Sequence, residues 1–147
     1  MVYLCVGEKK KPYQAAKNIP QLVSEPEVLY AVRQNRVSSE YLTNLKHVSG
    51  LSDEILSDSL NMNIKTFRNY KLTSLPLKPL LQEHVFALLA LYNHGIEVFG
   101  SHKPFNEWLD RINIFFDNDK PLHFLTTISG IKFIDNRLSA IQYGDNV

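Results

Sequence analysis

The stretch Leu80-Leu-Gln-Glu-His-Val-Phe-Ala-Leu-Leu-Ala-Leu-Tyr-Asn-His-Gly-Ile-Glu-Val-Phe-Gly100 decides the fold class of this chain. Its apolar residues recur at three- and four-residue spacing, which predicts one long helix over 80–99. Gly100 stands where helices commonly end. Gly95 lies inside the helix at a cost of about 1 kcal/mol relative to alanine, and we interpret it as a close helix crossing. The residues expected on the buried face are Leu81, Val85, Leu88, Leu89, Tyr92, Ile96 and Phe99.

Short helices are predicted after this long one. Pro104 is expected to begin a helix, residues 117–121 to form a turn, and residues 122–125 to form one short helical turn. Thr126 or Thr127 is expected to cap a final helix. The apolar positions expected on the inner faces of these helices are Phe105, Trp108, Leu109, Ile112, Ile131, Ile134, Leu138 and Ile141.

The part before residue 80 also follows a helical pattern. Apolar residues recur from Leu22 to Val32, and again from Val37 to Leu45 in a helix that Ser38 or Ser39 is expected to cap and Gly50 to end. We find neither β-type alternation nor an internal repeat, so the predicted fold class is all-α. The predicted divisions are an N-terminal arm (1–20), a helix-turn-helix domain (21–79) and a compact helical C-terminal domain (80–147).

Composition narrows the class of protein. The chain has 147 residues, enough for one domain or two small ones that share a core, and 44% of them are hydrophobic, which excludes the disordered class. Residues 1–74 hold ten Lys/Arg against seven Asp/Glu, whereas residues 75–147 hold six against eight, so the first half is the more basic one. Cys5 is the only cysteine, and no apolar run approaches the roughly 20 residues that span a bilayer. We expect a soluble, cytoplasmic protein that makes no membrane contact.

Residues 51–71 are predicted to form two helices joined by a short turn, as in a DNA-reading helix-turn-helix. Ser52 is a suitable N-cap, and Ser57 is small where the two helices would touch. Asn61 tolerates the left-handed backbone that the turn requires, and Asn63 can cap the second helix. The expected apolar wedges are Met62, Phe67 and Tyr70.

The second of these helices carries the candidate DNA contacts. Arginine can read guanine, asparagine can read adenine, and lysine and threonine can hold phosphates. The cations are few for a phosphate-dominated affinity, which favours a homodimer with two half-sites. A helical hairpin that binds nothing has the same pattern. The candidate DNA-binding residues are Asn63, Lys65, Thr66, Arg68, Asn69 and Lys71.

The sequence gives no sign of an enzyme. No nucleophile stands beside a base in a recognisable motif, no glycine-rich phosphate loop is present, and we expect no cofactor. The five histidines have neither i,i+4 pairs nor cysteine neighbours, so we expect no metal site. Most aromatic residues of the second half are expected in the core, whereas the adjacent Phe115 and Phe116 cannot easily both point inward, so one of them should be exposed.

The two halves together resemble the Xre/MbcA/ParS antitoxins, in which an Xre-like helix-turn-helix precedes a toxin-binding domain. The resemblance covers about residues 22–144, and its C-terminal motifs are the more specific. Those motifs are Val98-Phe99-Gly100, Trp108-Leu109, Pro121-Leu122 with Leu125, Gly130, and Leu138 with Ile141 and Gly144.

The resemblance implies one half of a type II toxin–antitoxin module. The usual partner is a RES-domain toxin, which destroys NAD; the C-terminal helix would plug its active-site cleft, while the helix-turn-helix would bind the operator of the operon. Two departures are that Asn61 replaces the common glycine of the turn and that the reading helix has few arginines. The residues that the resemblance places nearest the toxin are Arg137, Ile141, Gln142, Tyr143 and Gly144.

Two other functions remain open at this point. A stand-alone transcription regulator would use its C-terminal part only to dimerise, whereas a protein-only adaptor would bind no DNA. A toxin gene beside this one favours the antitoxin, and a gel shift separates a regulator from an adaptor.

Overall fold

The computed structural model describes residues 39–73 and 77–145, and within them the fold is all-α, as predicted. The β pairing described there is one isolated bridge, between Asn113 and Asp119. The expected arm at 1–20 and the helical pattern at 22–32 lie outside the described residues. The elements are α3 (Glu40–Ser49), α4 (Asp53–Ser59), α5 (Ile64–Leu72), α6 (Pro79–Phe99), α7 (His102–Leu109), η1 (Ile114–Phe116), η2 (Pro121–Thr126) and α8 (Ile128–Gln142), of which η1 and η2 are 3-10 helices.

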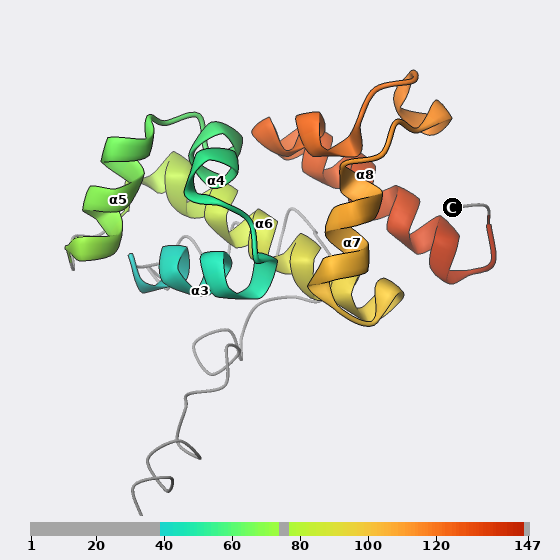
Figure 1. Ribbon diagram of the computed structural model, residues 1–147, viewed down its shortest axis with the longest axis horizontal. Coiled ribbons are helices and arrows are strands. Elements are labelled where there is room, and N and C mark those ends of the chain that lie inside the picture. Colours follow the sequence, from blue (N-terminus) through green and yellow to red (C-terminus); the bar gives the residue numbers. More distant parts are fainter. Residues whose placement is uncertain (1–38, 74–76, 146–147) are drawn as a thin grey trace, which may run out of the picture.

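Helix α6 is the centre of the molecule. It runs from the side formed by α3, α4 and α5 to the side formed by α7 and α8, and it packs against α3, α7 and α8 (Figure 1). The prediction of one buried face was too narrow, because Phe86, Ala87, Ala90 and Leu91 are buried as well. A helix covered by neighbours on several sides buries most of its circumference. The resulting core is one continuous cluster that extends from Leu42 to Leu138.

Side-chain caps begin the helices close to where the sequence predicts. Ser52 accepts a hydrogen bond from the backbone N–H of Ile55 (3.3 Å), and Thr127 accepts one from Gly130 (3.0 Å). Ser39 takes the N-cap position of α3, but its side chain makes no capping hydrogen bond. At the other end, α3 closes at Gly50 (φ 64°), as predicted.

Gly95 allows α6 and α7 to cross closely, which confirms that prediction. A methyl group at this position would overlap the ring of Phe105. That ring is fully buried and packs against Tyr92, Phe99 and Trp108, with ring centroids 5.1, 5.8 and 6.1 Å away. The crossing therefore seats an aromatic cluster where only a glycine leaves room.

The region between α7 and α8 differs most from expectation. Helix α7 begins two residues before Pro104 and ends at Leu109, so Ile112 lies outside it and is 66% exposed. The prediction of a buried Ile112 was wrong because the helix ends one turn too early to carry it inward. Residues 122–125 do form a short helical turn, as part of η2, whereas η1 was not predicted. No helix among the described residues is both long and apolar enough to cross a bilayer.

Candidate functional site

The segment from α4 to α5 has the two helices and the short turn that the sequence predicts for residues 51–71. Asn61 adopts a left-handed backbone conformation (φ 55°), which turns the chain between the helices. Asn63 caps α5 by accepting a hydrogen bond from the backbone N–H of Thr66 (2.8 Å). Ser57 is buried and donates to the carbonyl of Glu54 (2.9 Å). Helices α4 and α5 therefore both begin at the N-cap residue that the sequence predicts, Ser52 and Asn63.

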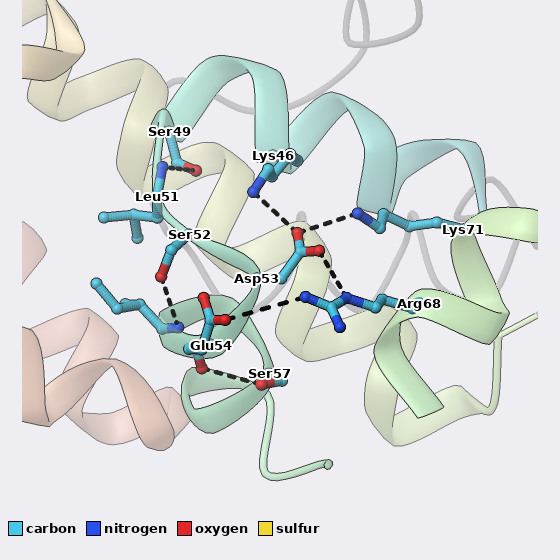
Figure 2. Close-up of polar contacts among 10 residues, drawn as sticks. Lys46, Ser49, Leu51, Ser52, Asp53, Glu54, Ser57, Arg68 and Lys71 are labelled. Carbon is cyan, nitrogen blue, oxygen red and sulfur yellow. Dashed lines mark hydrogen bonds and ion pairs between the residues drawn. The ribbon is translucent and has the colours of Figure 1, made fainter. Parts of the chain in front are cut away.

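Asp53, at the start of α4, draws three cations together. Its carboxylate lies 2.8 Å from Nζ of Lys46, 3.1 Å from Nε of Arg68 and 3.0 Å from Nζ of Lys71, so it joins α3, α4 and α5 (Figure 2). Hydrogen bonds from Lys46 and Lys71 lower the pKa of Asp53 well below its ordinary value. Arg68 also lies 3.9 Å from Glu54. Arg68 and Lys71, which the sequence predicts to contact DNA, therefore form ion pairs with carboxylates of the same chain.

The six candidate DNA-binding residues consequently fall into different environments. Lys65 and Asn69 are exposed on α5, and within the described residues no ion pair engages Lys65. Arg68 keeps 54% of its side chain exposed, but Lys71 keeps only 22%. Thr66 is half-buried. Sequence reasoning missed Asp53 as a partner, because it is 15 and 18 positions away from these cations and no periodic pattern links them.

The turn of this segment is attached to the C-terminal part. The Asn61 side chain donates to the carbonyl of Thr126 in η2 (2.8 Å). His84 of α6 lies 2.8 Å from the carbonyl of Leu125, and burial lowers the pKa of His84. A cavity of about 740 Å³ opens beside these contacts, lined by Leu60, Asn61, Met62, Thr66, Tyr70, Lys78, Pro79, Leu80, Leu81 and His84.

The five residues predicted to face a toxin lie at the end of α8, but they do not share one face. The Arg137 side chain is only 10% exposed: its guanidinium lies 3.5 Å from the ring centre of Phe115, and Nη1 lies 2.7 Å from Oδ2 of Asp145. Gln142 points the other way, toward α6, where it meets His94 and Glu97. Ile141 is half-buried and packs against the core.

The last turn of α8 presents the most exposed aromatic side chain of the described residues. Tyr143 is 88% exposed, and its backbone N–H bonds to the carbonyl of Ser139 (3.2 Å). Gly144 has a φ of 97° and turns the chain away from the helix axis. An ordered backbone that carries a solvent-exposed tyrosine is a suitable shape for insertion into a pocket of another protein.

Further exposed apolar side chains lie on α8 and η1. Phe133 is 46% exposed and Phe115 is 43% exposed, whereas Phe116 between them is buried. The prediction that one of the adjacent pair Phe115 and Phe116 is exposed is therefore confirmed. Ile114 adds a further side chain that is 75% exposed. We call Ile114, Phe115 and Phe133, together with the outer edge of Arg137, the η1–α8 surface; apolar surfaces of this kind commonly mark protein contacts.

A comparison with known protein families finds a similarity in this C-terminal part. Residues 94–144 match the family model described as the antitoxin Xre/MbcA/ParS C-terminal toxin-binding domain. The match runs from the last turns of α6 to the end of α8, which is about a third of the chain. The search of curated proteins gives no match.

Proposed function

We propose, from the toxin-binding match over residues 94–144, that this chain is the antitoxin of a type II toxin–antitoxin module. It neutralises a cognate RES-domain toxin by occluding the active site of that enzyme. The chain is not itself an enzyme in this proposal, and the module is cytoplasmic. The similarity of residues 94–144 to a toxin-binding domain is the observation on which this proposal depends.

The shape of the C-terminal end supports occlusion as the mechanism. Tyr143 projects from the last turn of α8, and a buried tyrosine at the centre of an interface is a common hot spot. Phe133 of the η1–α8 surface lies on the same helix, and this surface supplies further exposed apolar area. We propose that Tyr143 and Gly144 enter the cleft of the toxin, while the edge of Arg137 and its neighbours contact the rim.

A co-expression experiment tests this proposal. Full-length chain and adjacent toxin gene are induced together, and growth and cellular NAD are followed. The Tyr143→Ala variant should lose protection, because it removes the projecting side chain without touching the core. Leu72→Ala is the matched control, since Leu72 is also exposed (84%) but lies on α5. If Tyr143→Ala protects as well as Leu72→Ala, occlusion by this end is refuted.

We further propose that α4 and α5 bind the operator and repress the operon, and that the protein acts as a homodimer. The support is the capped geometry of the turn together with Asn63, Lys65 and Asn69 on the exposed side. A gel shift with the promoter at stated salt tests this, with Lys65→Ala as the variant and the exposed Lys103→Ala of α7 as the control. Equal binding by both variants, or a monomer by light scattering with and without operator, contradicts it.

A protein-only adaptor is the second candidate, and one observation favours it. Asp53 engages Lys46, Arg68 and Lys71, which leaves few unshared cations on the reading helix. Phosphate contacts dominate most protein–DNA affinities. An adaptor would still protect cells from the toxin but would shift no promoter DNA, so the two experiments above separate the candidates.

A further inference from the structure

A chain of polar side chains joins α6 to the end of α8 and contains a buried histidine. His94 is fully buried, and its Nδ1 lies 2.7 Å from Oδ1 of Asp135. Its Nε2 lies 3.3 Å from Oε1 of Gln142. The amide nitrogen of Gln142 in turn donates to Oε1 of Glu97 (3.4 Å). We call these four residues the His94 clamp.

The atoms of the clamp determine its protonation. Each ring nitrogen of His94 faces an oxygen that can only accept, and a neutral imidazole has one N–H, so it could satisfy only one of the two. Rotating the amide of Gln142 would offer its NH₂ to the imidazole, but it would also turn the amide oxygen toward the carboxylate of Glu97. That rotation replaces a hydrogen bond with a repulsion. Every contact in the clamp is satisfied only when both ring nitrogens carry protons.

We propose that His94 is an imidazolium at neutral pH and that it fastens the last turn of α8 to α6. It is a positioning residue for Gln142, and through it for the neighbouring Tyr143. When His94 loses a proton, Gln142 loses one of its partners and the last turn is released. The consequence for a partner rests on the proposed function, whereas the clamp itself is a property of the free chain.

The surroundings of His94 agree with this charge. Burial lowers its pKa, but the hydrogen bond and charge of Asp135, with smaller contributions from Gln142 and Glu97, raise the pKa above its ordinary value near 6.5. Helices α3 and α7, which also pack on α6, bury no charged residue. A raised pKa in the folded state means that the clamp stabilises fully below about pH 6.5 and is lost as the pH rises through the folded value.

Nuclear magnetic resonance of the full chain tests the clamp without any partner. The ring nitrogens of His94 should both show imidazolium shifts at pH 6, with a titration midpoint above the ordinary histidine value near 6.5. Amide protection of Tyr143, Gly144 and Asp145, corrected for intrinsic exchange, should fall about tenfold across that midpoint, as expected for the loss of one charge-assisted hydrogen bond. A single neutral tautomer at pH 6, or protection that is flat across the titration, overturns the proposal.

Two variants keep the test independent of folding. His94→Gln removes the titration at the buried end, with His47→Gln as its control, whereas Gln142→Ala breaks the clamp at the exposed end and leaves the buried pair intact. Gln142→Ala should lower the titration midpoint of His94 and lower the protection of the last turn even at pH 6. Unchanged protection in Gln142→Ala overturns the proposal, whether or not His94→Gln folds.

Affinity for the purified toxin measures the positioning role. At pH 6, Gln142→Ala should bind the toxin about tenfold more weakly than the wild-type chain does. The wild-type chain should weaken by a similar factor when the pH is raised above the titration midpoint of His94. The same pH series with His94→Gln corrects for the pH dependence of the toxin itself. Equal affinities, with protection lost in the free chain, overturn the positioning role. If the wild-type chain binds no toxin at any pH, the proposed function fails, and the free-chain measurements still decide the clamp.

Discussion

Replacing Gly95 with alanine tests how tightly α6 and α7 are packed. Alanine stabilises a helix interior by about 1 kcal/mol relative to glycine, so the substitution would help an open helix. Here the added methyl group meets the ring of Phe105, which three other aromatic rings hold in place. Overpacking a closely packed core costs about 1–3 kcal/mol. Whether the substitution stabilises or destabilises the chain depends on how easily the ring of Phe105 can move. Because the ring is fully enclosed, we expect a net loss of about 1–2 kcal/mol.

Urea unfolding followed by fluorescence of Trp108, the single tryptophan, is a suitable assay because this residue packs on Phe105. With a slope of about 2 kcal/mol per molar urea, in the middle of the usual range, the midpoint should fall by roughly 0.5–1 M. The control is the same substitution in a Phe105→Leu background, where a smaller side chain relieves the overlap and the loss should shrink. A Gly95→Ala chain that is more stable than the wild type would show that the ring moves freely, and the argument from close crossing would fail.

Three further outcomes are expected. Gly130→Ala should lower the free energy of unfolding by about 2–3 kcal/mol, because its methyl group would overlap the backbone carbonyl of Phe124, which no rotamer change can move. The control is Ser129→Ala at an exposed position, which should change the stability by no more than about 0.5 kcal/mol. Equal stability of the two variants in thermal unfolding refutes the overlap. Asp53→Asn should cost about 1–2 kcal/mol at pH 7, since partly exposed ion pairs contribute modestly. The lowered pKa of Asp53 means that this stabilisation is present above about pH 3.8 and is lost as the pH falls further, so a wild-type advantage that persists unchanged in strong acid contradicts it. Asn63→Ala should lower stability by about 1 kcal/mol through loss of its cap, and unchanged denaturant midpoints would count against the capping role.

The helices could be predicted from the sequence because their signals are local. The three- and four-residue spacing identified α6, and the capping residues Ser52 and Asn63 identified where α4 and α5 begin. The left-handed turn at Asn61 was predictable for the same reason, since asparagine is one of few residues that tolerate that conformation.

The candidate site was harder to predict because it depends on contacts between distant residues. The sequence places Arg68 and Lys71 on α5, but only the packing of α4 against α5 brings Asp53 to them. Likewise, Gln142 faces α6 because of His94, which lies 48 positions earlier. Helical periodicity gives the face on which a residue lies, but it does not give the partner that covers that face.

The central position of α6 limits which segments of this chain can be exchanged with those of a related protein. Because the same helix completes the core on both sides, a graft that joins the first 79 residues of one relative to the remainder of another replaces the surface against which α3 must pack. Recombination at that junction should therefore yield insoluble hybrids unless the crossover also carries the α3 residues that touch α6. Under the proposed function, toxin specificity would more readily change through substitutions at exposed positions of η1 and α8, such as Ile114 and Phe133, which lie outside the core.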